Sequence, residues 1–112
     1  MTEAVAERLR VLASEASIEV TPRHAEKLAE LNGALPSGTR VYITALPGAD
    51  AGDLVRASSL ARAAGYVPVP HITARAIAGD AALDALLRQL RERAAVDDVL
   101  VIAGGGATVA GD

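Results

Sequence analysis

The chain has 112 residues, enough for one small domain, and 51% of them are hydrophobic while only 2% are aromatic, so Ala, Val and Leu must fill its core. A net charge of −3, with no basic stripe and no long apolar run, argues against nucleic acid and membrane as partners. The lack of cysteine excludes disulfides and thiolate metal sites, and with no signal peptide we expect a cytoplasmic protein.

Apolar periodicity predicts alternating helices and strands along the whole chain. In chain order we expect a helix over 3–13, a strand over 17–20, a helix from Thr21-Pro22, a strand over 40–46, a helix between 50 and 65, a strand over 66–72, a helix from about 80 and a strand over 99–103. Short loops and crossover helices of this kind require parallel strands joined by right-handed connections.

The fold class is therefore α/β, and residues 1–112 are expected to form one domain. A doubly wound sheet is possible, but one layer of helices and polar residues at the strand ends favour the first half of a (βα)8 barrel preceded by an N-terminal helix. A full barrel takes roughly 250 residues, so we expect the chain to be a partial barrel. Pro68 and Pro70 are awkward in a central strand and easier to accept where a barrel strand bends.

Glu19 is the first candidate for chemistry, because it lies between Ile18 and Val20 in an apolar strand. A carboxylate there is expected to be partly desolvated, which raises the pKa and suits it to general acid catalysis. The alternatives are an inward Glu paired with an Arg or an amide, and an outward Glu on a short edge strand.

Thr44 and His71 end the second and third predicted strands, where side chains can contact a bound ring or ribose. Each also has an ordinary structural interpretation, as a β-branched strand residue and as a packed histidine. The other histidine, His24, is expected to face solvent, and because the two histidines lack metal-ligand spacing we expect no metal site.

Three glycines, Gly104, Gly105 and Gly106, follow the fourth predicted strand. Bare backbone at this point would let a ligand approach closely and offer its amides to an anion. The spacing matches neither a dinucleotide-binding fingerprint nor a P-loop, and a flexible rim loop is the alternative.

Four segments together resemble the methylenetetrahydrofolate reductase family. Ser17-Ile18-Glu19-Val20-Thr21-Pro22-Arg23 resembles that family's Phe-Glu-Phe-Phe-Pro-Pro signature, and Arg40-Val41-Tyr42-Ile43-Thr44 resembles its second strand. Pro70-His71-Ile72-Thr73-Ala74 is similar to Pro-His-Leu-Thr-Cys on its third strand, and the passage from Val96 to Gly105 is similar to its fourth helix-to-strand passage. The resemblance runs in order along nearly the whole chain.

The resemblance implies a flavin-carrying (βα)8 barrel that reduces 5,10-methylenetetrahydrofolate to 5-methyltetrahydrofolate with NADH or NADPH. It implies that Glu19 is the acid that opens the methylene bridge, and it places Thr44, His71, Gly104 and Gly105 beside the cofactor. The family's fourth strand ends in Arg-Gly-Asp, whereas this chain reads Ala103-Gly104-Gly105. Because both charged groups are missing, we expect FAD to bind weakly or not at all.

Three interpretations remain open from the sequence. The first is the N-terminal half of a folate reductase, inactive alone, with a small-molecule folate as substrate. The second is a non-catalytic half-barrel that binds a nucleotide or phosphate at the glycines. The third is an assembly module whose exposed sheet edges pair with another chain, and unpaired parallel edges in any case predict a homo-oligomer.

Overall fold

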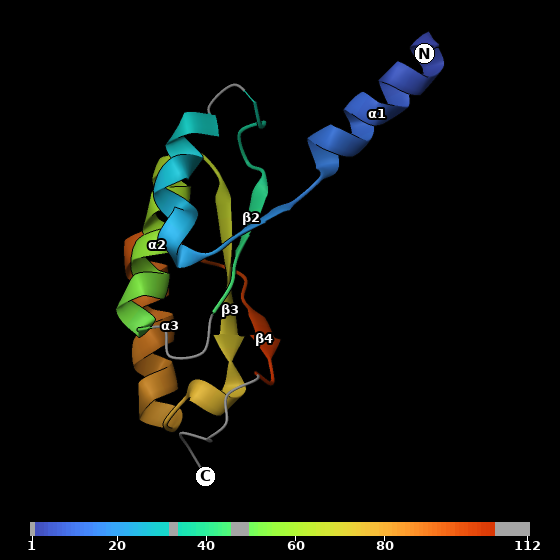
Figure 1. Ribbon diagram of the computed structural model, residues 1–112. Coiled ribbons are helices and arrows are strands. Elements are labelled where there is room, and N and C mark those ends of the chain that lie inside the picture. Colours follow the sequence, from blue (N-terminus) through green and yellow to red (C-terminus); the bar gives the residue numbers. More distant parts are fainter. Residues whose placement is uncertain (1, 32–33, 46–49, 105–112) are drawn as a thin grey trace.

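The predicted alternation of helices and strands is confirmed by the computed structural model, which describes residues 2–31, 34–45 and 50–104 (Figure 1). Its elements are α1 (Glu3–Glu15), β1 (Ile18–Val20), the 3-10 helix η1 (Pro22–Leu31), β2 (Arg40–Ile43), α2 (Ala51–Ala63), β3 (Val67–Thr73), the short 3-10 helix η2 (Ala74–Ala76), α3 (Asp80–Ala94) and β4 (Leu100–Ile102). The second strand is shorter than predicted, because it ends at Ile43.

The four strands form one parallel sheet in the order β1-β2-β3-β4, so each strand pairs with its neighbour in sequence. The helices η1, α2 and α3 lie together on one face of this sheet, and α2 contacts both of the others (Figure 1). The remaining long helix, α1, projects away from this body and has no buried residue.

The core lies between the sheet and α2, and small side chains on that helix make it thin. Ala57, Ser58 and Ala61 of α2 are almost fully buried, as are Val41 and Ile43 on β2. The Ser58 hydroxyl donates a 2.8 Å hydrogen bond to the Leu54 carbonyl within the same helix, so its burial leaves no unmet polar group. As the composition predicted, aliphatic side chains fill most of this layer.

Two prolines of β3, Pro68 and Pro70, fit inside the sheet because their nitrogen atoms, which carry no hydrogen, point away from β2. The Val67 N–H donates to the Thr39 carbonyl at 2.9 Å, on the side of β2. Backbone hydrogen bonds alternate in direction along a strand, so Pro68 and Pro70 would donate toward β4. Since β4 pairs with β3 only from His71 onward, neither proline removes a bond from the sheet.

Arg62 ties α2 to the end of α3. Its Nε donates to the Ala94 carbonyl at 3.1 Å and a terminal nitrogen donates to the Ala95 carbonyl at 2.8 Å. Ala95 ends α3 in the left-handed conformation, with φ of 50°. The guanidinium therefore satisfies carbonyls that a helix leaves unpaired at its C-terminus, and its positive charge suits that end of the helix dipole.

Tyr66 provides a test of this packing, because only 1% of it is exposed and its buried hydroxyl finds no partner among the described residues. Removing an unmet donor while keeping the ring should be harmless, so Tyr66→Phe should leave the free energy of unfolding unchanged or raise it by up to about 1 kcal/mol. Tyr66→Ala should lower it by about 3–5 kcal/mol through the lost packing. Urea unfolding measures both, and a clear loss of stability in Tyr66→Phe would contradict the assignment.

Candidate functional site

The face of the sheet opposite the helices carries most of the residues selected from the sequence. Glu19, Tyr42 and Val69 are in register across β1, β2 and β3, and residues in register on parallel strands point to the same side. Val41 and Ile43 point to the helices, so this row points away from them. We call this side the uncovered face, because none of η1, α2 and α3 lies on it (Figure 1).

The side chain of Glu19 is exposed on the uncovered face, so the expected partial desolvation is not found within the described residues. Its position corresponds to the alternative of an outward Glu on a short edge strand, since β1 is three residues long and ends the sheet. The prediction was wrong because apolar neighbours in sequence, Ile18 and Val20, point to the other face of a strand and cannot desolvate the residue between them. Only a structure that covers this face can bury Glu19.

His71 lies one row further along the uncovered face and is 9% exposed. Its ring is tilted by 60° against that of Tyr42, with ring centroids 6.2 Å apart. The Arg40 guanidinium in turn lies 6.0 Å from the centroid of the Tyr42 ring and 3.3 Å from the Asp98 carboxylate. The Tyr42 side chain, and after it Asp98, raises the pKa of Arg40 above its ordinary value, so this cation stays charged.

Tyr42 was missed by the sequence reasoning, although it lies at the centre of this group. The signal was available, because alternation along Arg40-Val41-Tyr42-Ile43-Thr44 puts Tyr42 on the same side as Thr44. Tyr42 was instead counted only as part of the predicted strand over 40–46.

Thr44 lies at the carboxyl end of β2, as predicted, and is bound to the neighbouring strand. Its N–H donates to the Val20 carbonyl at 2.9 Å, and its hydroxyl donates to the same oxygen at 3.3 Å. The hydroxyl proton is thus used within the sheet, and the oxygen remains able to accept a hydrogen bond from a ligand. The register of β2 and β3 puts Thr44 beside His71.

Gly104 follows β4 with a positive φ of 95°, and Gly105 lies outside the described residues. A Cβ atom on Gly104 would lie 2.2 Å from the Cγ2 methyl of Thr73, far inside contact distance. The described structure therefore explains this glycine by close packing of two strand ends, a reason that differs from the predicted approach of a ligand.

Arg75 is a second residue that the sequence reasoning missed. It follows β3, and its backbone N–H donates to the Ala103 carbonyl at 3.1 Å, so it lies beside the exit of β4. Its buried Nε has no hydrogen-bond partner among the residues that the structure describes. Arg75 thus brings a positively charged side chain to the end of β4, where Ala103 and Gly104 carry no charge.

A cavity of about 440 Å³ lies on the helix side of β3 and β4, near the start of α3. Its lining is mostly apolar, with Ile72, Val101 and Leu83 among the contacts and Asp80 as the one charged side chain. Among the residues that the structure describes, Glu19, Thr44, His71 and Gly104 do not line it, so we do not assign it to the candidate site.

Within residues 2–31, 34–45 and 50–104, no three His, Cys, Asp or Glu side chains gather into a metal-binding group. Over the same residues, no helix has both the length and the apolar character needed to cross a bilayer. A comparison of the chain with models of known protein families gave no match.

The packing of Gly104 on Thr73 can be measured by substitution. Gly38 is a matched control, because its φ is also positive, at 84°, and a Cβ added there would meet no atom of the described residues within 4 Å. Gly38→Ala should cost about 1–2 kcal/mol from backbone strain alone, and Gly104→Ala should cost about 1–3 kcal/mol more because Thr73 must move. Urea unfolding of both variants gives the difference. Adding Thr73→Ser, which removes the methyl group, should recover most of the excess, and equal costs at the two glycines would contradict the contact.

Proposed function

We propose that this chain is the N-terminal half of a (βα)8 barrel. The consecutive strand order supports this, because a doubly wound sheet reverses its order and carries helices on both faces, whereas η1, α2 and α3 share one. In a closed barrel the uncovered face becomes the interior, and the free edges of β1 and β4 pair with further strands. A second copy of the chain is the alternative partner for these edges, which is the basis for expecting a homo-oligomer.

We further propose that the completed barrel is a methylenetetrahydrofolate reductase-like enzyme that takes a hydride from NADH or NADPH. The observation that supports this best is that Glu19, Thr44 and His71, selected from separate motifs, lie on one face in neighbouring rows of the sheet. Barrel interiors at the carboxyl ends of strands are where such enzymes hold their substrates.

Glu19 has the role of the acid in this proposal. Closing the barrel over the uncovered face removes bulk water from around its carboxyl group, so that the carboxyl group faces the bound substrate. Glu19 then gives its proton to the folate as a carbon–nitrogen bond of the methylene bridge breaks, and the iminium that remains accepts the hydride. Thr44 and His71 would contact the rings of the bound molecules, with the Thr44 oxygen as an acceptor.

The described end of β4 does not fit a flavin held as the family resemblance implies. Ala103 and Gly104 provide no charged side chain, and the bare face of Gly104 is taken up by the Thr73 methyl group. We therefore assign no step to flavin in this chain. Arg75, beside the Ala103 carbonyl, supplies the positive charge at this point and suits the phosphates of a nicotinamide dinucleotide.

The same cation favours the second candidate function, a non-catalytic domain that binds a nucleotide or phosphate. This function needs Arg75 but has no use for Glu19. Because the catalytic candidate also uses Arg75, the two candidates differ in whether Glu19 matters.

Glu19→Gln tests the catalytic assignment in the complete encoded protein. The variant keeps the shape and hydrogen-bonding capacity of the side chain but has no proton to donate. Turnover of methylenetetrahydrofolate should fall by about two to four orders of magnitude, with folate affinity and thermal stability nearly unchanged. Tyr42→Phe, on the same face, is the control and should keep most of the activity. If Glu19→Gln turns over as fast as the wild type, the assignment of Glu19 as the acid is wrong. If neither protein reduces methylenetetrahydrofolate while Arg75→Gln loses the NADH binding of the wild type, the non-catalytic function is favoured.

Flavin content is the second test. The purified 112-residue chain is mixed with excess FAD, and unbound FAD is removed by gel filtration. The flavin absorbance that remains should be far below that of a complex with one FAD per chain, because the charged pair of the family's fourth strand is missing. Restoring it with Ala103→Arg and Gly105→Asp gives the matched variant, which should retain more FAD. A yellow wild-type chain with one flavin per molecule would contradict the prediction.

A further inference from the structure

The helix α1 stands apart from the rest of the structure and exposes an apolar stripe. Val5, Leu9 and Leu12 are 47%, 51% and 66% exposed, and they follow one another at the four- and three-residue spacing of a coiled-coil seam. Ala16 continues the seam at the end of the helix. Monomeric proteins seldom leave such a continuous stripe in water.

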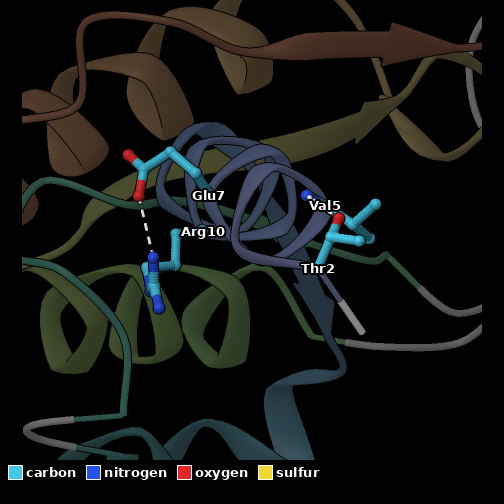
Figure 2. Close-up of polar contacts among 4 residues, drawn as sticks. All are labelled: Thr2, Val5, Glu7 and Arg10. Carbon is cyan, nitrogen blue, oxygen red and sulfur yellow. Dashed lines mark hydrogen bonds and ion pairs between the residues drawn. The ribbon is translucent and has the colours of Figure 1, made fainter.

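The opposite side of α1 carries an ion pair within the helix and one exposed apolar side chain, Val11, which is 45% exposed. Glu7 and Arg10 form an ion pair there, with Arg10 Nη1 2.8 Å from Glu7 Oε2. Figure 2 shows this pair on one side of the helix, and Val5 with the capping residue Thr2 on another. A helix of 13 residues is marginal in water without tertiary contacts, and the stripe is the longest row of exposed apolar side chains through which α1 can be stabilised.

The residues on the two sides of the stripe differ, and this difference determines which orientation of a second helix α1 fits. One flank carries Ala6 and Ala13, and the other carries Arg8 and Glu15, two opposite charges seven residues apart. In an antiparallel helix pair like flanks face each other, whereas in a parallel pair each flank faces the unlike one. Arg8 and Glu15 can therefore pair with each other across a dimer only when the two helices are antiparallel.

We infer that α1 pairs with α1 of a second copy of this chain in an antiparallel, two-fold symmetric dimer. With Leu9 of one helix level with Leu12 of the other, Arg8 and the partner's Glu15 differ by only about 3 Å along the axis, and the symmetric pair is equivalent. The two Arg8 side chains are about 7.5 Å apart along the axis. The Ala6 and Ala13 flanks, which have no bulk, let the backbones come close on the other side.

This contact is independent of the proposed function and of the sheet edges. Two short helices bury less than the roughly 1,200 Å² of a standard interface, so we expect a dissociation constant in the micromolar range or weaker. Sedimentation equilibrium from about 10 µM to 1 mM in low salt is the matching measurement, with helicity followed by circular dichroism over the same concentrations. Dimer and helicity should rise together.

A charge swap separates this dimer from every other assembly. Arg8→Glu and Glu15→Arg each put like charges against each other and should weaken the dimer about 3- to 30-fold. The double variant should return to within about twofold of wild type, and a mixture of the two single variants should associate as tightly as wild type. Glu7→Arg, on the opposite side of α1, is the control and should change the affinity little.

Three further outcomes would contradict the inference. Replacing Leu9 and Leu12 with Glu should abolish the association measured above and the rise in helicity that accompanies it, while the near-ultraviolet spectrum of the body, which comes from Tyr42 and Tyr66, stays unchanged. Association that this change leaves undiminished belongs to the sheet edges or another surface and overturns the inference. Failure of the double charge variant to recover overturns the antiparallel arrangement, as does a wild-type chain that remains monomeric at 1 mM.

Discussion

The packing of α2 against β2 and β3 is the contact on which the rest of the fold depends. Ala57, Ser58 and Ala61 present almost no bulk, so the helix comes close to the strands and buries Val41 and Ile43 completely. Because η1 and α3 both pack on α2, the position of this one helix sets the whole helical layer. The near absence of aromatic residues is what makes such a thin layer possible, since a Phe or Trp on this face would hold the helix away.

One layer of helices leaves the other side of the sheet free to carry polar groups. Strand side chains alternate, so committing Val41 and Ile43 to the core also commits Tyr42 and Thr44 to the opposite face. The same alternation places Glu19 and His71 there. The candidate site is therefore a consequence of core packing. Polar residues that alternate with core residues along each strand point to the same, opposite face of the sheet.

Much of the fold could be predicted from the sequence, because periodicity and turn residues are local signals. The helix from Asp80 and the strand before Thr73 were found this way, within one or two residues. The exposure of Glu19 could not be found, because it depends on what covers a face, and that information lies in other parts of the fold. The role of Gly104 was missed for a related reason, since its partner Thr73 is distant in sequence and only the pairing of β3 and β4 brings them together.

The direction of the strands keeps the α1 surface apart from the carboxyl ends of the strands, where Thr44 and His71 of the candidate site lie. The helix α1 leads into the first residue of β1, so it lies at the amino ends of all four parallel strands, whereas Thr44 and Gly104 lie at their carboxyl ends. The longest strand, β3, has seven residues, which separates the two ends by about 23 Å. Pairing of α1 with a second copy therefore leaves the carboxyl ends open to a ligand. Substitutions in the apolar stripe of α1 should therefore act on assembly without touching Thr44 or His71, whereas Glu19, four residues beyond the end of α1, is the member of the candidate site nearest to that helix in sequence.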